Sequence, residues 1–424
     1  MMPGSFLGGA KSRLLPASIP YRFFLAASGF HVLGWLVLLF GADELPGFVG
    51  GPGLVLSALH LITLGVLAMT AIGASFQLLP VVTRQPLSRV WPTRVTFWLF
   101  TPGVLILAYG MAENIHYVMA LGGLLSTVGL LVFALVTVDN LSRAGSLPLV
   151  AAHGWAALAS LVGLVAAGWV LMADLEHGVL DDHQSLAILH MILAAFGFMG
   201  LLVGGLSMVL IPMFVLARSL PSRPGWVQLG SGLGALVAFV LAYFTGLDLL
   251  FWLGIATGAV SAGSYLWLMR AAMKGAMRKR NGLAFVVIRV SWVFLGLGVV
   301  LAAAVAADAP IPNGPALMGF SLIVGWLLTF LTGVLQRIMP FLASMHASAP
   351  GGMPPLLSEL TADGPLKVHA VCHFAGLALC LSGIVADLGL IVRAGAAIGL
   401  IGALGFAVFA ITVLRRLNTP SIAG

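Results

Sequence analysis

Six of the ten histidines in the sequence fall inside long apolar segments. These residues are His31, His60, His153, His190, His369 and His373. A neutral imidazole tolerates burial and is the commonest metal ligand among protein side chains. Ionisable side chains inside membrane-spanning segments are costly and are usually functional. The chemistry of this protein is therefore expected at these imidazoles, although any one of them can instead be a packing residue bonded to a backbone carbonyl.

His369 and His373 are the two histidines with the most suggestive spacing. They are four residues apart in one apolar segment, so both rings lie on the same face of the predicted helix. Two imidazoles placed in this way can hold a metal ion. They can equally be two buried polar groups bonded to neighbouring carbonyl oxygens, and the spacing alone leaves both readings open.

The composition excludes a water-soluble globular protein. Hydrophobic residues make up 60% of the 424 residues and charged residues only 8%, whereas soluble domains carry about 25% charged residues. Backbone groups in lipid must be satisfied within their own segment, so apolar runs of about 20 residues are expected to be helices. We predict an all-α polytopic membrane protein, with residues 1–424 forming a single transmembrane domain in contact with the lipid bilayer.

Apolar runs separated by polar residues predict twelve membrane-spanning helices. Their approximate ranges are 21–42, 54–79, 95–112, 116–138, 149–173, 187–215, 226–247, 249–270, 284–307, 315–341, 367–389 and 391–416.

The charges in the loops between these helices alternate along the chain. One set of loops and termini contains most of the basic residues, among them Lys11, Arg143 and the run from Arg278 to Arg280. The other set is acidic, and its single basic residue is Arg393. The positive-inside rule places the basic set and both termini in the cytoplasm. Because the net charge of +7 belongs to these loops, it does not indicate a nucleic-acid partner.

Three segments near the ends of predicted helices 2, 6 and 10 share a spacing. Each has a glycine seven residues before a proline: Gly73 and Pro80, Gly205 and Pro212, Gly333 and Pro340. The pairs are four helices apart, which predicts three four-helix repeats at about 21–138, 149–270 and 284–416. Small residues let membrane helices approach closely, and the prolines are expected to end these three helices.

His60 and His190 occupy similar places in the first two repeats. His60 is thirteen residues before Gly73, and His190 is fifteen before Gly205, so the match is approximate. The third repeat has Phe320 thirteen residues before Gly333. Both histidines are expected near the outer ends of their helices.

The run Leu59-His60-Leu-Ile-Thr-Leu-Gly65, continuing to Gln77-Leu-Leu-Pro80, resembles helix 2 of the haem–copper oxidase catalytic subunit, subunit I. That family has twelve helices, cytoplasmic termini and a threefold arrangement of four-helix arcs. The resemblance implies a bacterial-type inner membrane protein in which His60 is an axial ligand of a low-spin haem. It leaves the second ligand open between His31, His190 and Met318.

The sequence departs from the family at the other ligand positions. His190 is followed by Met191 and Ile192 rather than by the family's Pro-Glu type motif, and the ranges 226–247 and 315–341 contain no histidine. In the family these two helices supply copper and haem ligands. We therefore expect no copper, no intact binuclear centre and no reduction of oxygen or nitric oxide.

The resemblance favours a membrane-embedded haem-binding electron-transfer or sensor protein, with a cytochrome or another redox subunit as a possible partner. Two alternatives stay open from the sequence. One is a haem-free transporter or permease for a metal or a small neutral solute. The other is a scaffold that anchors a peripheral redox partner. The sequence does not define the oligomeric state.

The predicted orientation can be tested with reporter fusions. Fusions after residues 280 and 350 are expected to report a cytoplasmic location, and a fusion near residue 180 an external one, because the loops around them differ in basic charge. Alkaline phosphatase and green fluorescent protein fusions at the same three positions measure this. A cytoplasmic signal at residue 180 would contradict the orientation.

Overall fold

The computed structural model describes residues 13–277, 281–347 and 354–418. Twelve helices in these residues are long and apolar enough to cross a membrane, and no strand occurs in the part of the chain that is described. This confirms the all-α membrane fold expected from the sequence. Four basic residues used to predict the orientation lie outside the described residues: Lys11, Arg278, Lys279 and Arg280. The fusion sites at 280 and 350 lie outside them as well.

Nine of the twelve spans are single helices. They are α2 (Ser18–Phe40), α5 (Pro92–Glu113), α6 (His116–Ser142), α7 (Pro148–His177), α10 (Ser222–Thr245), α11 (Asp248–Lys274), α12 (Leu283–Ala306), α16 (Asp363–Ala386) and α17 (Gly389–Asn418).

The other three spans change helix type along their length. The second span consists of α3 (Leu54–His60), η2 (Leu61–Ala68) and α4 (Met69–Thr83), where η denotes a π-helix. The sixth consists of α8 (His183–Ile192), η3 (Leu193–Met199) and α9 (Gly200–Val215), and the tenth of α13 (Gly314–Phe320), η4 (Ser321–Leu328) and α14 (Thr329–Ala347). A short helix, α15 (Leu357–Leu360), follows the tenth span.

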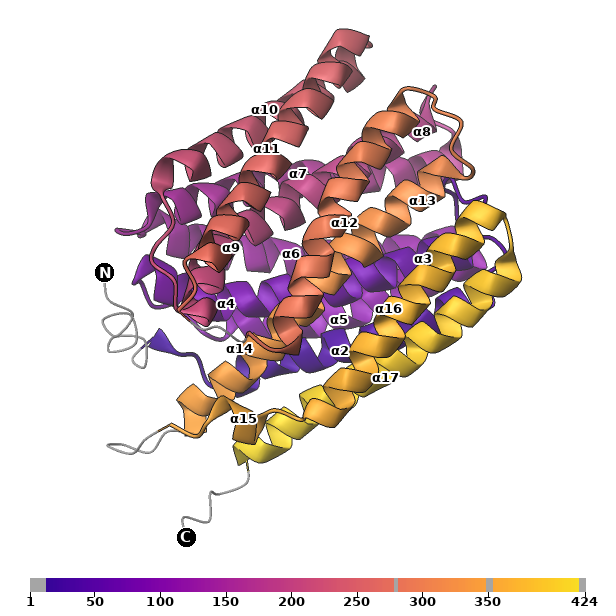
Figure 1. Cartoon of the computed structure of the whole chain (residues 1–424). Helices are drawn as coiled ribbons and strands as arrows, with labels where there is room; N and C mark the ends of the chain where they lie inside the picture. The colour runs from indigo at the N-terminus through magenta and orange to yellow at the C-terminus, as the bar shows by residue number, and fades with distance from the viewer. Residues whose placement is uncertain (1–12, 278–280, 348–353, 419–424) are drawn as a thin grey trace.

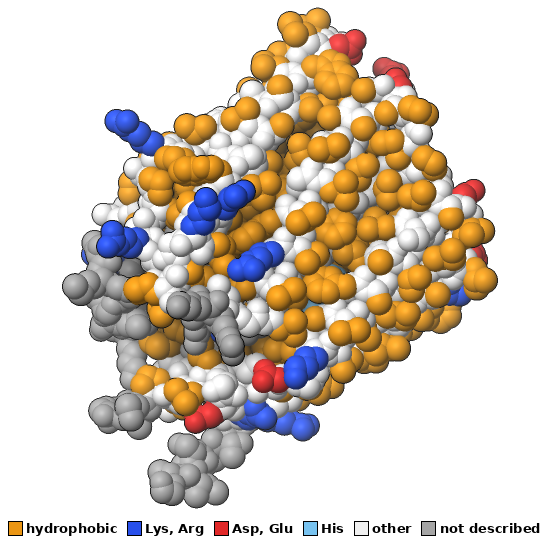
Figure 2. Space-filling view, in the orientation of Figure 1, with side chains coloured by type: hydrophobic (Ala, Val, Ile, Leu, Met, Phe, Trp, Pro, Cys, Tyr) orange, Lys and Arg blue, Asp and Glu red, His pale blue; other side chains and the backbone are white. Residues whose placement is uncertain are grey.

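These three mixed spans form the centre of the bundle (Figure 1). Between 61% and 83% of an 18-residue apolar stretch is buried in each of them, compared with 17–50% in the other nine. The π-helix η4 contacts both η2 and η3. The apolar side chains of the outer helices cover the visible face of the molecule between its two ends, as a lipid-facing surface requires (Figure 2).

The first and last spans pack against each other and close the bundle into a ring. α17 contacts α2 along its length, and α5–α6, α10–α11 and α16–α17 are helical hairpins. The start of α2 and the end of α17 lie at the same end of the bundle (Figure 1). A chain that crosses the membrane an even number of times begins and ends on the same side, so this arrangement is consistent with twelve spans.

Glycines on the central spans let the neighbouring helix approach at short range. A Cβ atom built on Gly65 would lie 2.5 Å from Cγ of Phe30 in α2, and one on Gly197 would lie 2.8 Å from Cβ of Ser160 in α7. Gly325 is equally close to Phe294 in α12. Each of these glycines is the fifth residue of its π-helix.

A second glycine follows eight residues later in each central span, again against the preceding helix. Gly73 lies against Phe23, Gly205 against His153 and Gly333 against Ile288. The same pair of close approaches therefore occurs three times, with equal spacing. This supports the threefold internal repeat, which stays a prediction.

Each of the three prolines lies inside its helix, and two of the helices end within one turn after it. α4 ends three residues after Pro80 and α9 three residues after Pro212, and the next residue has a left-handed conformation in each case. α14 instead continues for seven residues beyond Pro340. The expectation that Pro340 ends its helix was wrong, because a proline removes a backbone donor and introduces a clash only with the turn that precedes it.

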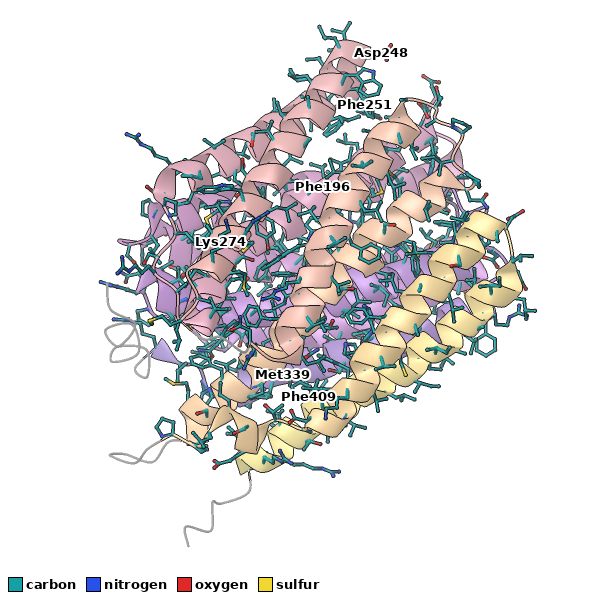
Figure 3. All side chains as sticks on the ribbon, viewed as in Figure 1. Phe196, Asp248, Phe251, Lys274, Met339 and Phe409 are labelled. Atoms are coloured by element: carbon teal, nitrogen blue, oxygen red, sulfur yellow. The ribbon has the colours of Figure 1, made fainter. Side chains whose placement is uncertain are left out.

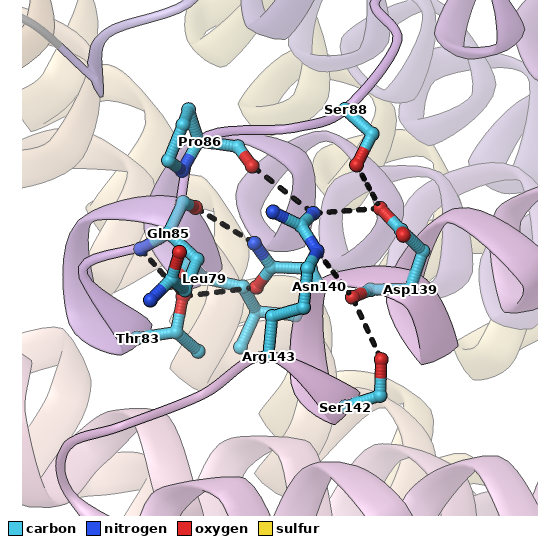
Figure 4. Close-up of polar contacts among 9 residues, drawn as sticks. All are labelled: Leu79, Thr83, Gln85, Pro86, Ser88, Asp139, Asn140, Ser142 and Arg143. Carbon is cyan, nitrogen blue, oxygen red and sulfur yellow. Dashed lines mark hydrogen bonds and ion pairs between the residues drawn. The ribbon is translucent and has the colours of Figure 1, made fainter.

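Polar residues tie the loop after α4 to the end of α6 (Figure 4). The side-chain amide of Asn140 donates to the carbonyl oxygen of Gln85 at 2.8 Å. The carboxylate of Asp139 accepts hydrogen bonds from Arg143 and Ser88, both at 2.7 Å. These contacts fix the connection between the second and third spans at the end predicted to be cytoplasmic.

The charge pattern is visible on single helices as well as in the loops. Asp248 and Lys274 mark opposite ends of α11 (Figure 3). Arg393, the basic exception in the acidic set of loops, forms an ion pair with Asp43 in the loop after α2. The exception thus carries a local partner of opposite charge.

The close approach at Gly65 can be tested by adding one methyl group. Gly65→Ala is expected to lower the free energy of unfolding by about 1–3 kcal/mol, because the ring of Phe30 must move away from the added Cβ atom. Gly29→Ala is the matched control, since Gly29 is exposed and has no atom within 4 Å of its Cβ position. The melting temperatures of both variants are measured by thermal unfolding, which is monitored by size-exclusion chromatography. Equal melting temperatures for the two variants would contradict the packing.

Candidate functional site

The structure brings His60 and His190 together near one end of the central helices. His60 is the last residue of α3 and lies directly before η2, and His190 lies near the end of α8. Their ring centres are 6.5 Å apart, with 31° between the ring planes. The residue directly before η3 is Ile192, so His190 stands two residues away from the position that corresponds to His60. The two-residue difference in spacing that the sequence shows is therefore also found relative to the start of each π-helix.

Backbone carbonyls orient both rings. Nδ1–H of His60 donates to the oxygen of Leu56 at 3.0 Å, and Nδ1–H of His190 donates to the oxygen of Leu164 in α7 at 3.1 Å. Because a neutral imidazole carries one proton, Nε2 of each ring is left with a free lone pair. This is the usual arrangement of a histidine that binds a metal, in which the second ring nitrogen donates to a carbonyl or a carboxylate.

Gly168 in α7 gives His190 the space for its ring. A Cβ atom on Gly168 would lie 3.2 Å from Cε1 of His190. At the start of α8, the carboxylate of Asp182 accepts hydrogen bonds from the hydroxyl and the N–H of Ser185, and these bonds hold the pKa of Asp182 below its usual value. Asp182 is therefore an N-cap that fixes the first turn of the helix carrying His190.

The two rings would hold a metal group through the nitrogens that the backbone leaves free. Their ring centres are 6.5 Å apart, and neutral imidazoles with free Nε2 lone pairs are donors of the kind that ligate a haem iron. Two cavities of about 110 Å³ and 40 Å³ in the bundle lie elsewhere, and neither is lined by His60 or His190.

A second group of histidines lies on α2 and α16. His31 in α2 and His369 in α16 have ring centres 5.8 Å apart, and His369 and His373 have ring centres 5.4 Å apart. All three side chains are buried, with at most 1% of each residue exposed. Spacing in the sequence predicted the proximity of His369 and His373, whereas the addition of His31 depends on the contact between the first span and the eleventh.

The remaining candidate residues lie outside these two groups. Met318 is half-buried on α13, two residues before the end of this helix at Phe320. His153 is buried in α7, and its ring nitrogens are bonded to Leu149 and Gln228, so it is a packing residue. Among the described residues, no group of three His, Cys, Asp or Glu side chains converges to hold a metal ion. A metal site at His369 and His373 alone stays a prediction.

A cavity of about 110 Å³ is a feature that the sequence analysis did not anticipate. It lies between the sixth span, α10, α11, α12 and η4, and its wall is mostly apolar. Its polar wall residues are Gln228, Ser261, Tyr265 and Trp326. Gly232, Gly254 and Gly258 also line the space. Glycines combined with a glutamine inside two adjacent apolar segments are the only signal in the sequence that points to such a cavity.

Comparison with known proteins supports the fold. No family model matches the sequence, and no curated protein is significantly similar to it. The structure is similar to a chain of a haem–copper terminal oxidase dimer solved by cryo-electron microscopy, with a TM-score of 0.65 and 12% sequence identity. The match covers 97% of this chain and 85% of that chain. The fold expected from the resemblance of the second span is thereby confirmed over nearly the whole chain.

Proposed function

We propose that this protein is a membrane-embedded haem-binding electron-transfer or sensor protein, with His60 and His190 as the axial ligands. One observation carries the proposal. The two rings are oriented by backbone carbonyls, present free Nε2 atoms, and stand 6.5 Å apart on two central helices of an oxidase-like fold. The proposal takes His190 as the second ligand, in place of His31 and Met318, which the sequence had also left open.

The protein's own residues have two tasks at this site. The carbonyl oxygens of Leu56 and Leu164 select the tautomer that leaves Nε2 free. The apolar helices around the site exclude water and lower the local polarity, which adjusts the potential of a bound haem. The haem would supply the one-electron chemistry. The natural partner is a cytochrome or another redox subunit in a bacterial-type inner membrane, and both termini are assigned to the cytoplasmic side.

A second candidate is a permease for a small neutral solute. The cavity of about 110 Å³ favours it, because its apolar wall carries a few polar groups and lies between helices of a bundle. The visible spectrum of the purified protein separates the two candidates. A strong Soret band in stoichiometric amount supports the haem protein, and a colourless, fully folded preparation leaves the permease and the haem-free scaffold.

His60 provides the most direct mutational test. If His60 ligates haem, His60→Gln and His190→Gln are each expected to remove or shift the low-spin spectrum with little change in membrane yield, since a metal is bound through one specific nitrogen. If His60 only satisfies a carbonyl, the loss is one hydrogen bond of about 0.6 kcal/mol and the spectrum stays unchanged. His116→Gln, at the start of α6, is the control. An unchanged spectrum in His60→Gln would eliminate this ligand assignment.

Catalytic silence is the other expected outcome. Membranes enriched in this protein are expected to show no added reduction of oxygen or nitric oxide, because residues 226–247 and 315–341 lack histidines. Oxygen and nitric oxide electrodes measure the rates with an artificial electron donor. Turnover that survives purification and disappears in His190→Ala would refute the expectation.

A further inference from the structure

The buried histidines His31, His369 and His373 have an incomplete set of hydrogen bonds. Each ring has one nitrogen bonded to the protein and one nitrogen without a partner. The unpartnered atoms are Nδ1 of His31, Nε2 of His369 and Nδ1 of His373. Buried polar atoms without partners are rare because they lose their hydrogen bonds to water without replacement. Three of them belong to rings in mutual contact, so one small molecule that reaches all three would satisfy them together.

The bonded nitrogens define which unpartnered nitrogen carries a proton. Nε1–H of Trp35 donates to Nε2 of His31 at 3.1 Å, so the proton of the neutral His31 ring is on Nδ1. Nδ1 of His369 lies 3.1 Å from the oxygen of Gly402 and must donate to it, so Nε2 of His369 is bare.

His373 is assigned through its neighbour Thr329. The hydroxyl of Thr329 donates to the oxygen of Val324 at 2.8 Å, so its oxygen is left to accept from Nε2–H of His373 at 2.7 Å. Nδ1 of His373 is therefore bare. The three free positions together consist of one N–H donor on His31 and two lone pairs on His369 and His373.

We infer that these three imidazoles bind one water molecule. Water can accept from Nδ1–H of His31 and donate its two protons to Nε2 of His369 and Nδ1 of His373, which satisfies all three rings. Buried waters in proteins make about three hydrogen bonds to groups that would otherwise be unsatisfied. The ligand class is thus a neutral molecule of the size of water that donates two hydrogen bonds and accepts one.

The same geometry argues against a transition-metal ion at this position. An ion needs lone pairs at about 2.0–2.1 Å from each nitrogen, and His31 presents a proton as long as it accepts from Trp35. No three such side chains converge closely enough in the described residues. A water molecule stands about 2.7–3.2 Å from its partners and suits rings that are farther apart.

The bound water connects parts of the chain that meet where the ring closes. His31 belongs to the first span and His369 and His373 to the eleventh, while Gly402 and Thr329 extend the network to α17 and the start of α14. The aromatic ring of Phe406 packs against both His31 and His369 and covers the group. The site is independent of His60 and His190.

High-resolution cryo-electron microscopy of the full-length protein in lipid nanodiscs tests the inference directly. A density peak is expected about 2.7–3.2 Å from Nδ1 of His31, Nε2 of His369 and Nδ1 of His373. Elemental analysis compares the native protein with His369→Phe. The native protein should hold no stoichiometric zinc or copper that the variant loses. A peak at metal distance together with such a metal, or no peak at all, would overturn the inference.

Nitrogen-15 NMR of histidine-labelled native protein gives a second measurement that needs no variant to fold. His31 and His369 are expected as Nδ1–H tautomers and His373 as the Nε2–H tautomer. In the variants, His373→Phe should remove the density peak, and the matched control His153→Phe should leave it, because the protein already satisfies both nitrogens of His153. An Nε2–H tautomer at His31 would contradict the proposed hydrogen-bond pattern.

Discussion

The close approach of the central helices to the helices that precede them is the constraint on which the rest of the structure depends. In lipid, helix association relies on packing and on polar contacts instead of the hydrophobic effect. Two glycines per central span remove the side chains that would keep the backbones apart, as at Gly65 beside Phe30 and at Gly73 beside Phe23. The first of these glycines is part of a π-helix each time, and π-helices are often found at functional sites. In the second span, the π-helix begins directly after His60.

The spans could be predicted from the sequence because their determinants are local. An apolar run of sufficient length must form a helix in a bilayer, and the predicted range 226–247 became Ser222–Thr245. The contact between His369 and His373 follows from helical spacing alone. The π-helices were not predictable, because residues 61–68 have the same apolar composition as the α-helical turns on either side.

The candidate site was only partly accessible from the sequence. His60 was found through its surroundings in the second span, but the choice of His190 over His31 and Met318 depends on which helices face each other. His31 is instead bound into the group with His369, because the first span packs against the last hairpin. Contacts between residues more than 300 positions apart carry no local signal. The cavity beside Tyr265 also lacks a local signal, since five spans contribute to its wall.

The contact between α2 and α17 has a consequence for biosynthesis. Membrane helices enter the bilayer in the order in which they are made, and α17 is the last of the twelve. The face of α2 that carries Trp35, buried against Gly399 in the finished protein, therefore waits for its partner until all other spans have been inserted. During that interval lipid or an insertion chaperone must cover it. A chain that stops before residue 389 would leave this face of the first helix permanently without its neighbour.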